Sequence, residues 1–133
     1  MPKFILNKLV RDKLRDEYER MGQKASYRAL SPDEHMAELK RKIIEEAKEI
    51  PEGATADQTI SEIADIQQAI NDLKDIKNIT DEQVETARAV KFDKKGGFSG
   101  ATFVESLELQ VGDEWIEYYR REPSTYIEVD DGR

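Results

Sequence analysis

Two pairs of carboxylates are the residues of this chain best suited to hold a metal ion. Glu46 and Glu49 form the first pair and, after twelve intervening residues, Glu62 and Asp65 form the second. Each pair has i, i+3 spacing, which places both carboxylates on one side of a helix about one turn apart. Like charges that lie this close repel each other and hold protons more tightly unless a cation lies between them. If the two pairs converge, they therefore predict a site for a divalent cation.

A donor set made only of oxygens favours Mg²⁺, with Mn²⁺ as a substitute. Magnesium accepts a few carboxylates while it keeps water and phosphate oxygens in its coordination shell. Zinc is not favoured, because the chain has no cysteine and a single histidine, His35. The chain is rich in glutamate, so such pairs also arise by chance on solvated helix faces. Glu38, Glu45 and Asp72 are alternative ligands.

Convergence of the two pairs requires a helical hairpin, and the flanking sequence predicts one. Residues 31–34 (Ser-Pro-Asp-Glu) are a capping box that begins a helix, and Pro51 and Gly53 end it. A second long helix is expected from Thr55 or Asp57 to about residue 77. Both helices carry apolar residues at three- and four-residue spacing, which predicts packing along one stripe. The stripe of the second helix consists of Ile60, Ile63, Ile66, Ile70 and Leu73.

Further helices are expected on both sides of this hairpin. Residues 8–21 have helical spacing and end at Gly22, while a capping box at residues 80–83 predicts a helix to about Lys95. Residues 101–110 alternate weakly and indicate a strand or an extended arm. Gly112 and Asp113 precede a last short helix that ends near Arg121.

The fold class predicted from these elements is all-α. We expect an antiparallel helical bundle with a short extended segment and a C-terminal helix, in a single domain over residues 1–133. Residues 99–133 would form a C-terminal appendage of this domain. Of the residues, 38% are apolar and 38% are charged, a balance that suits amphipathic helices with solvated outer faces.

Composition and charge also exclude several classes of function. The absence of cysteine rules out disulfides and thiolate catalysis and favours the cytoplasm, and no signal peptide or membrane span is expected. A net charge of −8 disfavours nucleic-acid binding, which depends on Lys and Arg at phosphates. The charge is uneven: residues 1–24 hold seven basic and four acidic side chains, and residues 105–133 hold three and nine.

The carboxylate motif resembles the metal motif of the all-α NTP pyrophosphatases, the MazG-like and phosphoribosyl-ATP pyrophosphohydrolase-like superfamily. A second resemblance is independent of it. The sequence KLVRDK at residues 8–13, together with KGGF at residues 95–98, is similar to the phosphoribosyl-ATP pyrophosphohydrolase-like "house-cleaning" branch. The two resemblances cover residues 8–98. That branch usually has Arg before Gly-Gly-Phe, and Lys95 keeps the charge but lacks the bidentate guanidinium.

The resemblance implies a hydrolase that cleaves nucleoside triphosphates between the α and β phosphates, giving a monophosphate and pyrophosphate. Glu46, Glu49, Glu62 and Asp65 would hold one or two Mg²⁺, and either Glu46 or Glu49 would accept the proton of the attacking water. It also implies a homodimer or tetramer. The expected substrate-binding residues are Lys8, Arg11, Lys13, Lys91, Lys95 and Asn71.

Two other functions fit the sequence. Phosphoribosyl-ATP pyrophosphohydrolase of histidine biosynthesis would use the same metal site with a different nucleotide pocket. A non-catalytic helical adaptor would carry merely solvated acidic faces and would bind a protein partner through Trp115, Tyr118 and Tyr119, which have helical spacing.

Overall fold

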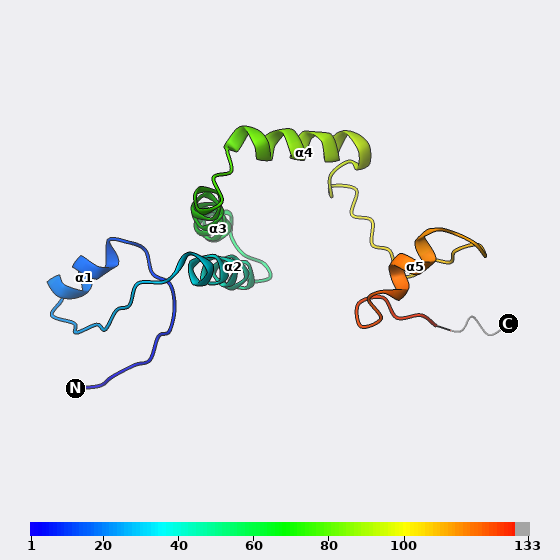
Figure 1. The fold of residues 1–133 in the computed structure, drawn as a ribbon. Coiled ribbons are helices and arrows are strands. Elements are labelled where there is room, and N and C mark those ends of the chain that lie inside the picture. Colours follow the sequence, from blue (N-terminus) through cyan, green and yellow to red (C-terminus); the bar gives the residue numbers. More distant parts are fainter. Residues whose placement is uncertain (130–133) are drawn as a thin grey trace. The chain divides into compact units, whose positions relative to one another are not determined.

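The computed structural model describes residues 1–129, which form five helices and no strand, so the all-α prediction is confirmed (Figure 1). The chain divides into two compact units, one over Met1–Asp93 and one that begins at Lys94. Each unit is described by itself. Within the described residues, no helix is long and apolar enough to cross a membrane.

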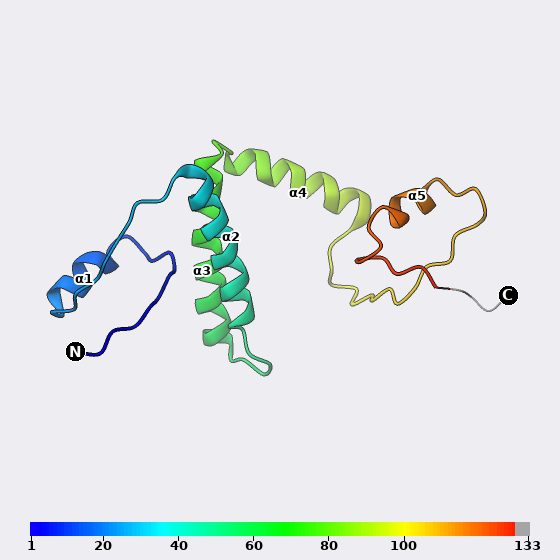
Figure 2. The same ribbon diagram turned by 60° about the horizontal axis from the view of Figure 1, so that its bottom comes forward.

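A hairpin of two long helices is the centre of the first unit. Helix α2 (Pro32–Lys48) and helix α3 (Ala56–Ile76) lie side by side and run in opposite directions (Figure 2). Among the described helices of the first unit, these two are the only pair in contact. The turn between them includes Gly53, whose φ of 70° lies in the left-handed region that favours glycine.

Capping boxes fix where both helices of the hairpin begin. The sequence predicts the box at Ser31, and the box at Thr55 selects the earlier of the two expected starts of the second helix. The Ser31 hydroxyl accepts the Glu34 N–H at 3.2 Å, and the Glu34 carboxylate accepts the Ser31 N–H at 3.3 Å. Thr55 and Gln58 form the same reciprocal pair, at 3.2 and 2.9 Å. Each box satisfies backbone donors that have no partner inside the helix.

The apolar core of the hairpin is small. Leu39 of α2 and Ala69 of α3 are its buried apolar side chains, with 2% and 4% of their surface exposed. Ile60 and Ile63 were expected in the packed stripe of α3, but they are 61% and 53% exposed. The helical period alone does not determine which edge of an apolar stripe faces the partner helix. This edge of α3 faces away from α2.

The remaining helices of the first unit depart from the prediction in one place. Helix α1 (Leu14–Arg20) begins six residues later than expected, because residues 8–13 are not helical. Helix α4 (Asp81–Lys95) follows the predicted capping box, in which Gln83 N–H donates to the Thr80 hydroxyl at 3.1 Å. Every residue of α4 is exposed.

The second unit is mostly irregular and contains helix α5 (Trp115–Arg120). The Asp113 carboxylate accepts the Trp115 N–H at 2.8 Å, in agreement with the predicted start of this helix. Residues 101–110 form no strand and have no regular secondary structure. The rings of Tyr118, Tyr119 and Tyr126 are in contact, with centroids 5.0 to 6.0 Å apart.

Replacing Leu39 with alanine should destabilise the protein more than a matched change on the surface of the same helix. We expect Leu39→Ala to lower the free energy of unfolding by about 2–5 kcal/mol. Ile44→Ala should cost only about 1 kcal/mol, since Ile44 is 47% exposed. Urea titrations followed by helical circular dichroism measure both values. Equal losses would contradict the assignment of Leu39 to the core.

Candidate metal centre

Three carboxylates from the two facing helices converge at the hairpin. Glu46 of α2 is buried, with 7% of its surface exposed, and Glu62 and Asp65 of α3 are half-buried. These three residues each offer a carboxylate oxygen, and the three oxygens lie within 4.8 Å of one another. The antiparallel hairpin therefore brings one member of the first acidic pair against both members of the second.

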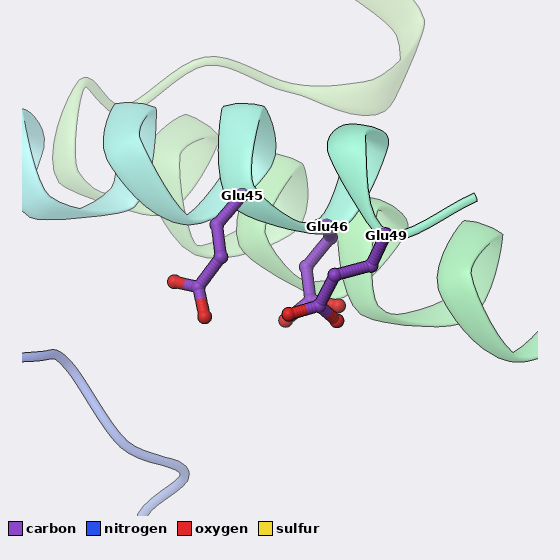
Figure 3. A group of neighbouring side chains, drawn as sticks. All are labelled: Glu45, Glu46 and Glu49. Carbon is purple, nitrogen blue, oxygen red and sulfur yellow. The ribbon is translucent and has the colours of Figure 1, made fainter. Parts of the chain in front are cut away.

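A second group of three carboxylates includes the same buried residue. Ligand oxygens of Glu45, Glu46 and Glu49 also lie within 4.8 Å of one another. Figure 3 shows the carboxylates of Glu46 and Glu49 meeting, with Glu45 extended on the same side of α2. Glu49 is the C-cap residue of α2, so it stands where the helix gives way to the turn. Glu46 thus connects the two groups into one acidic cluster.

The acidic cluster is under electrostatic strain. The pKa of Glu46 is raised, chiefly because its carboxyl meets that of Glu62 and one of the two must carry a proton to make that contact a hydrogen bond. Burial and the charge of Asp65 raise it further. The pKa of Glu49 is raised mainly by the neighbouring charge of Glu46. The repulsion is centred on Glu46.

One oxygen of this cluster has no partner. When the carboxylates are ionised, Glu62 Oε2 is a buried atom for which the described residues provide no hydrogen-bond donor. A buried polar atom left without a partner costs about 1–3 kcal/mol, and more if it is charged. This oxygen is therefore a site at which a bound cation would lower the free energy of the folded protein.

Three basic side chains approach the edges of the cluster. Lys42 Nζ lies 3.6 Å from Glu45 and 3.7 Å from Glu46. Two more come from the N-terminal segment: Lys8 Nζ lies 3.8 Å from Glu45, and Arg11 Nη2 lies 2.5 Å from Asp65 Oδ1. Arg11, predicted as a substrate-binding residue, thus lies beside the predicted metal ligand Asp65, and Lys8, also predicted, lies beside the alternative ligand Glu45.

Three of the other predicted substrate-binding residues lie elsewhere in the first unit. Lys13 is the exposed N-cap residue of α1, and Lys91 is exposed on α4, which packs against no other described helix of this unit. Asn71 is further along α3, where its side-chain oxygen accepts a hydrogen bond from Gln67 at 3.0 Å. The structure does not bring these three residues to the acidic cluster. Lys95 belongs to the second unit.

The geometry also sorts the alternative ligands. Glu45 joins the cluster, although it lies outside the four residues predicted as the ligand set. Its only sequence signal is that it directly precedes Glu46. Glu38 pairs with Arg41 at 2.7 Å, and Asp72 accepts a hydrogen bond from Gln68 at 3.1 Å. Neither belongs to either group of three.

A surface hollow adjoins the cluster near the turn that joins α2 to α3. It has a volume of about 230 Å³ and is lined by Glu49, Pro51, Gln58, Ser61 and Glu62. Two of these five residues belong to the predicted ligand set. The carboxylates are therefore accessible from a concave surface, which a ligand bound to a cation requires.

The donor set fits a hard divalent cation. Carboxylate oxygens are the ligands that Mg²⁺ and Mn²⁺ bind, and one of the converging residues, Glu62, carries the unpartnered oxygen. An ion with a double positive charge would offset the repulsion around Glu46. It would also satisfy the buried oxygen.

No protein-family model, curated protein or solved structure matches the chain. The resemblance to the MazG-like superfamily stays a prediction from the sequence motifs.

The raised pKa of Glu46 predicts a stability that depends on pH in the absence of divalent cations. Between its ordinary value of 4.5 and the raised value, the folded protein binds more protons at this residue than the unfolded chain does. This residue therefore destabilises the fold increasingly as the pH rises through that window. We expect Glu46→Gln to melt at a higher temperature than the wild type at pH 7 in a chelator, with the gap closing toward pH 4.5.

Thermal melts over this pH range measure the effect. Glu38→Gln is the matched control, because its carboxylate pairs with Arg41 outside the cluster and its loss should not raise the melting temperature. A wild type as stable as Glu46→Gln at pH 7 would contradict the repulsion.

Proposed function

We propose that this protein is a Mg²⁺-dependent nucleoside triphosphate pyrophosphohydrolase. The convergence of Glu46, Glu62 and Asp65, in which Glu62 also carries a buried oxygen without a donor, is the observation that carries the proposal. The two sequence resemblances, which are independent of each other, add the reaction class. Removal of unwanted nucleotides from the cellular pool is the role that this branch implies.

Charge explains why such a protein would need the cation. A triphosphate carries several negative charges and would be repelled by a cluster of five carboxylates, Glu45, Glu46, Glu49, Glu62 and Asp65. Bound Mg²⁺ would reverse the local charge, orient the phosphate oxygens and lower the pKa of the attacking water. The acidic cluster is thus compatible with an anionic substrate only through a metal ion.

Among the chain's own residues, Glu49 is the better placed general base. It lines the surface hollow, whereas Glu46 is buried between the helices. Its pKa is raised by Glu46, which brings the carboxylate closer to the proton affinity that a base needs near neutral pH. Glu46, Glu62 and Asp65 would then act as ligands that hold the cation in place.

Of the predicted substrate-binding residues, Lys8 and Arg11 are the best placed to meet the substrate's phosphates. Both already lie beside the acidic cluster, at 3.8 Å from Glu45 and 2.5 Å from Asp65. Arginine can donate two parallel hydrogen bonds to one phosphate group, which adds orientation to charge. The base and sugar of the nucleotide would be bound by other parts of the protein.

Incubation of the purified protein with ordinary and damaged nucleoside triphosphates and Mg²⁺ tests the reaction class. We expect release of pyrophosphate and a nucleoside monophosphate. Asp65→Asn and Glu49→Gln should reduce the rate by about 100-fold or more, since they remove a metal ligand and the proton acceptor. The measurement is pyrophosphate production, with products identified by chromatography.

Asp72→Asn and Glu38→Gln are matched controls that make the same chemical changes on the same two helices, outside the cluster. Both should keep near-normal rates. Release of a single phosphate would exclude the proposed cleavage position. Hydrolysis of phosphoribosyl-ATP alone would favour the histidine-biosynthesis enzyme, and no hydrolysis of any nucleotide would favour the adaptor.

We further propose that the chain assembles with copies of itself. Ile60 and Ile63 lie one turn apart on α3 and are mostly exposed, and α4 is exposed along its whole length. Isolated helices of this length are marginal in water, so α4 requires a packing partner. Each copy carries the same uncovered faces, which makes a symmetric homodimer or tetramer the simplest way to cover them.

Sedimentation equilibrium measures this assembly directly. We expect a mass that is twice or four times that of the 15.3 kDa chain. Ile60→Asp should weaken association by at least tenfold, because it places a charge on an apolar contact surface. Ser61→Asp, the next residue on α3, is the matched control and should leave the mass unchanged. A monomer that retains all its helical signal would contradict the proposal.

A further inference from the structure

The N-terminal segment contacts the metal centre through an arginine. Arg11 Nη2 lies 2.5 Å from Asp65 Oδ1, although 54 residues separate the two in the sequence. Residues 8–13 form no helix, and Lys8 provides the segment's other ion pair with the hairpin, to Glu45. Two charged contacts to the acidic cluster thus join this segment to α2 and α3, and Leu9 and Val10 between them are half-buried.

Arg11 and a divalent cation would compete for the same carboxylate. Asp65 offers an oxygen within 4.8 Å of oxygens from Glu46 and Glu62, and it also accepts the Arg11 guanidinium. A cation bound among these three carboxylates would lie close to the guanidinium, and like charges repel at this distance. The carboxylate charge that attracts Arg11 would also be largely neutralised.

We propose that Arg11 is an internal counter-ion of the metal-free centre, and that binding of a divalent cation displaces it and releases residues 8–13 from α3. The inference rests on the metal site of the proposed function and adds its regulation. The segment is bound while the centre lacks its cation and is freed when the cation is bound. The released guanidinium is then available to an anionic ligand.

The ion pair between Arg11 and Asp65 is weak enough for a bound cation to displace it. The Arg11 and Asp65 side chains are 59% and 35% exposed, and exposed ion pairs of this kind change an equilibrium by up to about fivefold. Such a contact holds a short segment in place without blocking a cation that binds several carboxylates. Removing Arg11 should therefore raise the affinity for the cation by about two- to fivefold.

Titration with Mn²⁺, followed by electron paramagnetic resonance of the free ion, measures this affinity in the full chain. Arg11→Gln removes the competing guanidinium. Lys13→Gln is the matched control, because it removes the same charge from the same segment and Lys13 forms no ion pair among residues 1–129. We expect Arg11→Gln to bind Mn²⁺ two- to fivefold more tightly than both the wild type and Lys13→Gln.

A second measurement uses the wild-type protein and does not depend on any variant folding. The ¹⁵N–¹H heteronuclear NOE of residues 9–12 reports motion of the segment, and saturating Mg²⁺ should lower it. In Arg11→Gln the NOE should be low before Mg²⁺ is added and should not change.

The outcomes separate this inference from the proposed function. If the wild type binds no Mn²⁺, or if Glu46→Gln binds Mn²⁺ with the same affinity as the wild type, the proposed metal site itself is wrong. If Mn²⁺ binds at the site but Arg11→Gln and Lys13→Gln have equal affinities, or Mg²⁺ leaves the NOE unchanged, the counter-ion role alone is overturned.

Discussion

The repulsion between carboxylates at the seam of two packed helices is the interaction on which the rest of this structure depends. The hairpin of α2 and α3 buries Leu39 and Ala69, and the same face of α2 buries Glu46. Packing the helices therefore brings negative charges together. A carboxylate in this position is expensive unless a cation or a proton compensates for it. Glu46 therefore destabilises the fold at a position where an apolar side chain would pack without this electrostatic cost.

This arrangement would couple folding to the binding of a cation. The carboxylates of the cluster come from both helices, so they converge only when the hairpin is formed. A cation that binds the folded chain alone would stabilise it by mass action. Under the proposed function, the bound ion would thus add stability to a hairpin whose apolar core is small.

The features that sequence predicts well here are those fixed by neighbouring residues. The predicted capping boxes at Ser31 and Thr80 determine helix starts through hydrogen bonds that span three residues, and both are present, together with a third at Thr55. The i, i+3 carboxylate pairs follow from helical geometry in the same way. Once the turn at Gly53 is recognised, the hairpin brings the pairs onto facing helices.

The features that sequence does not predict are set by distant contacts. Residues 8–13 have helical spacing, yet their charges pair with α2 and α3 and the segment is not helical. The exposure of Ile60 and Ile63 depends on how α3 is rotated against α2, which a periodic pattern leaves open. The spacing also leaves open which of the alternative ligands joins the cluster, and the structure places Glu45 there but not Glu38 or Asp72.

The exposure of helix α4 affects how the protein unfolds locally. A helix without tertiary contacts gains little from the rest of the fold, so within a single chain it can melt while α2 and α3 stay paired. The amide hydrogens of α4 would then exchange with solvent at nearly the rate of a free peptide, whereas those around Leu39 and Ala69 would exchange only when the hairpin separates. A single chain would thus unfold in two steps, first at α4 and then at the hairpin. An assembly that covers α4 would make the two steps one cooperative transition.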